Sequence, residues 1–135
     1  MSGSGVVTGV IVVRCGEAVF PAPGWNDFPV IVLSWWTAEC RKLFSGETAR
    51  CRFMDGPFEF QMRPRDDRHI TIAFFHRDAP CHSISPSVVD RGVVVGALCD
   101  AARQMLLECE RRGWHNTDTD GLRTSFTAIA CRHWA

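Results

Sequence analysis

Residues 49–63 read Ala-Arg-Cys-Arg-Phe-Met-Asp-Gly-Pro-Phe-Glu-Phe-Gln-Met-Arg. Apolar side chains alternate with charged or polar ones on both sides of Asp55-Gly56-Pro57, a period of two that is typical of strands with one buried face. Asp-Gly-Pro between two such runs is strong turn chemistry. The stretch therefore predicts a β-hairpin.

A third strand follows the hairpin. Residues 64–68 are rich in proline, aspartate and arginine and predict a second turn, after which the alternating run His69 to His76 predicts a strand. The result is a three-strand antiparallel meander. Its core face would carry Ile70, Ile72 and Phe74 from the third strand. Its other face would be a polar surface on which opposite charges can pair across strands. The residues expected there are Arg50, Arg52, Glu59, Gln61, Arg63, His69 and Thr71.

Helical patterns lie on either side of the meander. A helix is expected from Phe28, capped by Asn26 or Asp27 and ended by Gly46, since apolar residues recur there at helical spacing. Its tryptophans, Trp35 and Trp36, are expected in the core.

The clearest helix spans Asp90 to Arg112 and is followed by Gly113, with a last short helix beginning at Asp118 or Asp120. Before the first helix, the β-branched run Val6 to Arg14 predicts a strand covered on both faces. The order β, α, βββ, α, α predicts a single α+β domain over residues 1–135. Its antiparallel sheet, made of the N-terminal strand and the three-strand meander, would pack against two or three helices.

Composition narrows the class of protein. The chain has 135 residues, of which 46% are hydrophobic, and its formal net charge is zero, so a general basic field for nucleic acid is absent. No apolar run approaches the roughly 20 residues of a membrane span. Seven cysteines, scattered singly, suit free thiols in a reducing compartment. We therefore expect a cytoplasmic protein with neither a nucleic-acid nor a membrane partner.

Few patterns point to catalysis. His76, Cys81 and His82 lie within seven residues, near Asp78, and imidazole and thiolate groups would suit zinc. Their spacing matches no common zinc motif, and ordinary loop residues are the preferred interpretation. The acidic pairs Asp66-Asp67 and Asp118-Asp120 are interpreted as turn and helix-capping residues. The sequence carries no phosphate-binding loop or hydrolase motif.

Three features together carry a family resemblance: residues 25–36, Trp-Asn-Asp-Phe-Pro-Val-Ile-Val-Leu-Ser-Trp-Trp, the glycine-ended helix that contains them, and residues 52–61, Arg-Phe-Met-Asp-Gly-Pro-Phe-Glu-Phe-Gln. With these the chain resembles the small cytoplasmic immunity proteins of bacterial polymorphic or contact-dependent toxin systems, the WapI-like group in particular. The resemblance covers about residues 25–76 and the general form of the helix that ends near Trp114.

The resemblance implies a stoichiometric inhibitor rather than an enzyme. Such a protein binds the C-terminal toxin domain of its own system and needs no cofactor. The resemblance leaves open whether the protein is a monomer or a homodimer. The residues that would contact the toxin are taken from their expected exposure: Asp55, Glu59, Asp66, Asp67, Trp114, Asp118 and Asp120.

Two other classes of function stay open. One is a small metal-dependent hydrolase built on the loop with His76, Cys81 and His82. The other is a homodimeric regulatory or ligand-binding module, in which the Trp-rich first helix forms an interface or lines an apolar pocket.

Overall fold

The computed structural model describes residues 9–15, 18–21, 26–54, 56–76 and 86–133. Strands β5 (Ala49–Arg52), β6 (Phe58–Pro64) and β7 (His69–His76) form the predicted antiparallel meander. A fourth strand, β8 (Ser87–Asp90), pairs with β7 at the edge of this sheet. Strand β8 was not predicted, because its four residues lie between a proline-containing loop and the start of a helix.

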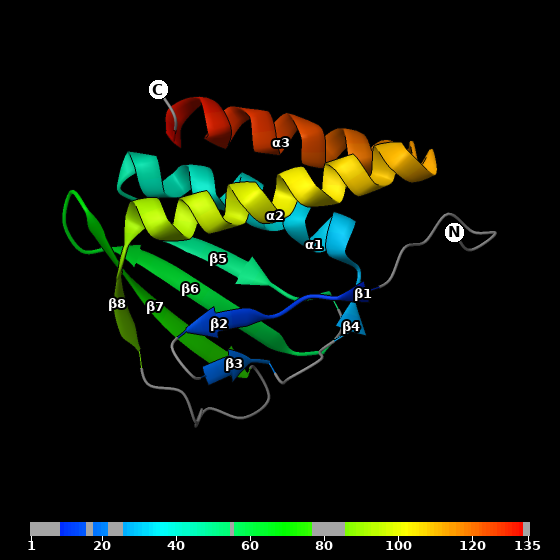
Figure 1. Cartoon of the computed structure of the whole chain (residues 1–135). Coiled ribbons are helices and arrows are strands. Elements are labelled where there is room, and N and C mark those ends of the chain that lie inside the picture. The colour runs from blue at the N-terminus through cyan, green and yellow to red at the C-terminus, as the bar shows by residue number, and fades with distance from the viewer. Residues whose placement is uncertain (1–8, 16–17, 22–25, 55, 77–85, 134–135) are drawn as a thin grey trace.

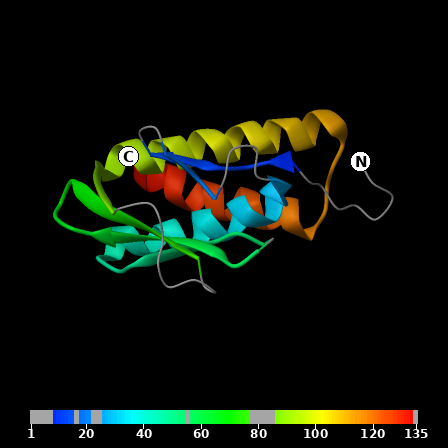
Figure 2. The ribbon, with the colours of Figure 1, turned by 90° about the horizontal axis from the view of Figure 1, so that it is seen from below.

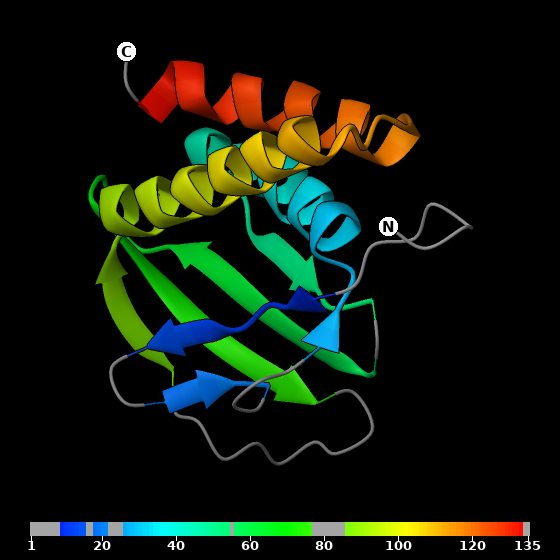
Figure 3. The same ribbon diagram turned by 45° about the vertical axis from the view of Figure 1, so that its right-hand side comes forward.

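The N-terminal strand does not join this sheet. Of the strand predicted over Val6 to Arg14, residues 6–8 lie outside the described part of the chain. From Gly9 on, two short strands occur in place of one, β1 (Gly9–Val10) and β2 (Val13–Cys15). β1 pairs with β4 (Asn26–Asp27), and β2 pairs with β3 (Ala18–Phe20). The β2–β3 hairpin crosses in front of the large sheet, below the helices (Figure 1, Figure 3). The apolar run is thus used to cover a sheet face, where it was expected to extend the sheet.

The first helix, α1, spans Pro29–Cys40 and continues as the 3₁₀ turn η1 (Arg41–Ser45). Gly46 ends the turn as predicted, with φ of +76°, a left-handed conformation that favours glycine. The predicted cap is wrong: Phe28 occupies the N-cap position. The carboxylate of Asp27 instead accepts the Phe28 backbone N–H at 2.8 Å.

Helix α2 (Arg91–Arg112) follows the prediction closely. Asp90 caps it by accepting the Val93 N–H at 3.2 Å, and Gly113 ends it with φ of +70°. Helix α3 (Thr117–His133) is longer than expected. It is capped by Asn116, whose side-chain oxygen accepts the Thr119 N–H at 3.0 Å. None of the helices in the described part of the chain combines the length and apolar character that a bilayer span requires.

The three helices lie together, with α1 between β5 and the other two (Figure 2). The core under α1 is aromatic: the Trp36 ring meets Phe53 and Phe60 edge-on, with centroid distances of 5.0 and 4.9 Å. Phe20, from β3, packs on Phe74 of the same sheet face, with 4.9 Å between the ring centroids. One face of the sheet is therefore buried by two different covers, α1 and the β2–β3 hairpin.

Only one of the adjacent tryptophans is in the core. Trp36 is 4% exposed and its Nε1 donates to the Arg52 carbonyl at 2.7 Å, which ties α1 to the end of β5. Trp35 is 42% exposed, so the expectation that both are buried is wrong for Trp35. Successive positions on a helix point about 100° apart, and the neighbours of α1 cover only one of these two directions.

This pair provides a matched test of the α1 contact. Trp36→Phe removes the indole donor and leaves the Arg52 carbonyl without that bond, so we expect the free energy of unfolding to fall by about 1–3 kcal/mol. Trp35→Phe, one residue away, should change it by less than about 0.5 kcal/mol. Urea unfolding of both variants measures the difference, and equal losses would contradict the assignment of Trp36 as the docking residue.

Candidate functional site

The candidate site is the face of the large sheet that points away from α1, here called the outer sheet face. The strand register brings together the side chains that the alternating pattern assigned to this face: Arg52 lies opposite Glu59, Arg50 opposite Gln61, and Arg63 opposite Thr71. On β7, Ala73 and Phe75 lie opposite Gln61 and Glu59. His69 of β7 and Val88 and Asp90 of β8 also belong to the described part of this face. The predicted pairing of opposite charges across strands is confirmed.

Glu59 is the centre of this face. Its carboxylate is held by two arginines from β5: Arg50 Nε lies 3.1 Å from Oε2, and Arg52 Nε lies 3.4 Å from Oε1. Gln61 Nε2 donates to the same Oε2 at 2.7 Å. The Glu59 side chain is 3% exposed, whereas those of Arg50 and Arg52 are 53% and 52% exposed. The carboxylate is thus covered by the residues that it holds, and these remain open to solvent.

These contacts change the acidity of Glu59. Desolvation raises its pKa, but the hydrogen bonds from Gln61 and Arg50 and the charges of Arg50 and Arg52 outweigh that effect, so the pKa lies below its ordinary value. Glu59 is therefore an anion at neutral pH that fixes two guanidinium groups. It was expected to be exposed and to contact a partner directly. The structure corrects this, since the arginines stand between Glu59 and solvent.

The β6–β7 turn at one end of this face is ordered by Asp66. Its Oδ1 accepts the backbone N–H groups of Arg68 and His69, both at 2.8 Å, and lies 3.0 Å from His69 Nδ1. The Arg68 N–H contributes most to lowering the pKa of Asp66, followed by the His69 side chain. Asp66 thus has the turn-forming role expected of it, and Asp67 beside it is exposed.

The remaining residues predicted to contact the toxin lie in different surroundings. Trp114 is only 9% exposed, and the Arg112 guanidinium carbon lies 5.1 Å from its ring centroid. The prediction that Trp114 is an exposed contact residue is therefore wrong. Asp118 and Asp120 are exposed in the first turn of α3 but do not cap it, since Asn116 does. Asp55 lies outside the described residues.

The exposed acidic candidates do not form one surface. The turn with Asp66 and Asp67 lies at one end of the molecule, and the α2–α3 turn that precedes Asp118 lies at the other (Figure 1). A single partner domain seated on the outer sheet face could reach the first group at its rim but not the second. The geometry therefore favours the arginines over the scattered carboxylates as the centre of an interface.

Of the loop considered as a metal site, the structure describes His76. His76 is the last residue of β7, and its ring meets Phe58 edge-on at 4.8 Å. Its Nδ1 is buried without a hydrogen-bond partner among the described residues. Asp78, Cys81 and His82 lie outside those residues. Within the part of the chain that the structure describes, no three His, Cys, Asp or Glu side chains are grouped to hold a metal ion.

Ala73 and Phe75 of β7 were not among the residues predicted for the outer sheet face, nor were Val88 and Asp90 of the unpredicted strand β8. Phe75 follows the core residue Phe74, so the period of two places its side chain on the opposite face, directly across from Glu59. Strict alternation along β7 was sufficient to find it. An aromatic ring beside two arginines is a combination that protein interfaces favour.

No family model, curated protein or solved structure matches the chain.

The role of Glu59 can be tested by Glu59→Gln. This change removes the charge that fixes Arg50 and Arg52, so we expect the free energy of unfolding at pH 7 to fall by about 1–3 kcal/mol. Because the folded pKa is lowered, the stabilisation by Glu59 is present above the ordinary carboxyl pKa, near 4.5, and is lost as the pH falls through the folded pKa.

The difference between wild type and Glu59→Gln should therefore shrink on acidification toward pH 3. Urea unfolding at several pH values measures it. Glu110→Gln, an exposed position on α2, is the matched control and should follow wild type throughout. A constant difference at all pH values would contradict the assignment of an ionised Glu59.

Proposed function

We propose that the protein is an immunity protein: a stoichiometric inhibitor that binds and neutralises the C-terminal toxin domain encoded beside it in a bacterial cell. We further propose that it captures this domain with the outer sheet face. The class comes from the family resemblance of the sequence. The surface is chosen on a single observation, the clamping of Arg50 and Arg52 by a covered Glu59.

Fixing the arginines favours their use in binding. A free arginine loses side-chain conformational entropy when it is immobilised at an interface, at a cost of about 0.5–1.5 kcal/mol. The Glu59 carboxylate and the strand register already orient Arg50 and Arg52, so less of that entropy remains to be lost. Arginine is also one of the residue types enriched among interface residues that dominate affinity.

The charge of this face indicates the chemistry of its partner. The described outer-face residues include three arginines, Arg50, Arg52 and Arg63, and two carboxylates, Glu59 and Asp90, which leaves an excess of positive charge. An acidic surface on the toxin domain would complement it and accelerate association by long-range attraction. Phe75 adds apolar area beside the charged groups.

One observation favours a second candidate, the metal-dependent hydrolase. The buried Nδ1 of His76 has no partner among the described residues, as a nitrogen reserved for a ligand would. Metal at one equivalent per chain in the purified protein, lost in His82→Ala, would support this function. Metal-free protein that still protects cells from the toxin would overturn it.

The binding surface is tested with Arg63→Glu. Arg63 is exposed on the outer sheet face and takes no part in the Glu59 cluster, so its reversal adds repulsion without disturbing the fold. We expect the affinity for the neighbouring toxin domain to fall at least about tenfold, the equivalent of 1.4 kcal/mol. Titration calorimetry with the purified domain measures the change, and co-expression shows whether growth is rescued.

Arg103→Glu is the control, because Arg103 is exposed on α2 and pairs only loosely with Asp100, at 3.6 Å. This variant should bind and protect as wild type does. Equal loss in both variants would contradict the choice of surface. Failure of the wild-type chain to bind the domain or to rescue growth would overturn the immunity function for that neighbour.

A further inference from the structure

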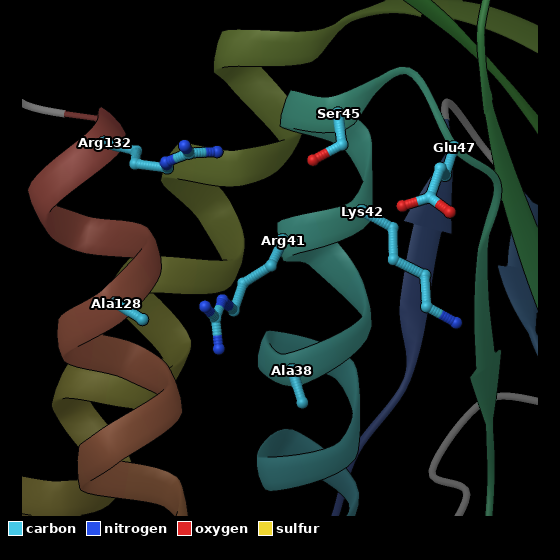
Figure 4. A pocket seen from close by; sticks show the side chains of 7 residues that line it. All are labelled: Ala38, Arg41, Lys42, Ser45, Glu47, Ala128 and Arg132. Atoms are coloured by element: carbon cyan, nitrogen blue, oxygen red, sulfur yellow. The ribbon is translucent and has the colours of Figure 1, made fainter.

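A groove lies between the C-terminal ends of α1 and α3, on the helical side of the molecule. It has a volume of about 390 Å³ and is lined by Ala38, Arg41, Lys42, Ser45, Glu47, Ala128 and Arg132. Figure 4 shows Arg41 and Arg132 projecting from the two helices into the space between them, with the Ser45 hydroxyl turned toward the same space. Neither the family resemblance nor the outer sheet face assigns this groove a role.

The course of the helices explains why the groove opens there. α1 and α3 run side by side in the same direction (Figure 1). Near their N-terminal ends the helices are close, since a Cβ on Gly121 would lie 3.3 Å from Ser34 Oγ. Farther along, the small side chains of Ala38 and Ala128 leave space between the helices, and long cationic side chains border it.

The charges in the groove are not all neutralised. Lys42 is engaged with Glu39, with Nζ 2.9 Å from the carboxylate. Arg41 and Arg132 form no ion pair within the part of the chain that the structure describes. Opposing them are the Glu47 carboxylate and the partial negative charges at the ends of α1 and α3. Apart from the Lys42–Glu39 pair, the side chains that line the groove carry two positive charges, on Arg41 and Arg132, and one negative charge, on Glu47, and the helix ends reduce this excess.

A neighbouring ring orients one of these groups. The guanidinium carbon of Arg132 lies 5.4 Å from the Phe44 ring centroid, and that of Arg91 lies 5.3 Å from the same centroid. Stacking on an aromatic face fixes the plane of a guanidinium group.

We propose that this groove is a binding site for a phosphate monoester dianion. Arginine donors match the oxygens of a phosphoryl group in pairs, and Arg41 and Arg132 approach from opposite helices, with the Ser45 hydroxyl as a further donor. Ala38 and Ala128 leave room for the organic part of a small ligand, and the volume is in the range of small-molecule sites. This inference does not rest on the immunity function.

The experiment is calorimetric titration of the whole chain with inorganic phosphate and, separately, with glycerol phosphate, both at constant ionic strength. We expect saturable binding at one site per chain. Tighter binding of the ester would indicate that the ligand is a phosphorylated molecule. Equal binding of both would indicate that the phosphate group alone accounts for binding. Either result supports the site.

Arg41→Gln and Arg132→Gln should each weaken binding at least tenfold, whereas Arg103→Gln should leave it unchanged. Arg132→Lys, which keeps the charge but loses the planar donor pair, should be intermediate. Thermal unfolding in phosphate-free buffer confirms that the variants are folded. Absence of saturable binding by the wild-type chain, or equal binding by wild type and both glutamine variants, would overturn the proposal.

Discussion

The register between β5 and β6 is the constraint on which the rest of the structure depends. It places Arg52 opposite Glu59 and Cys51 opposite Phe60, so aromatic and charged residues separate cleanly onto two faces. A slip by one residue would exchange the faces and bring the Glu59 carboxylate under Trp36. The cost of burying an unpaired charge beneath an aromatic ring excludes that alternative.

The inner and outer faces of the sheet have different roles. On the inner face, Trp36 docks α1, and Phe20 closes the β2–β3 hairpin over the remaining rings. On the outer face, the same hydrogen-bonded strands carry Arg50 and Arg52 in fixed positions around Glu59. Arg50 and Arg52 lie on the edge strand β5, which is paired along its length with β6. A binding surface on paired strands over a packed core is more rigid than one on a loop.

Local patterns predicted what depends on neighbours in sequence. Alternation found the meander and most of the outer face, and glycine placement found the ends of the helix turns at Gly46 and Gly113. The errors concern what depends on distant contacts: the exposure of Trp35, the separation of the N-terminal strand from the sheet, and the strand β8. The covering of Glu59 was missed because alternation gives the direction of a side chain but not the reach of the arginines across the strand.

Chemical labelling of arginines shows whether the outer sheet face is the surface that meets the toxin domain. The chain is treated with an arginine-specific dicarbonyl reagent, alone and in complex with the neighbouring toxin domain, and mass spectrometry reads the labelling of each residue. We expect Arg63 to be labelled less in the complex than alone, and Arg50 and Arg52 likewise where they react. Arg103 on α2 should be labelled equally in both states. Protection of Arg103 with unchanged labelling of the outer sheet face would contradict the choice of this surface.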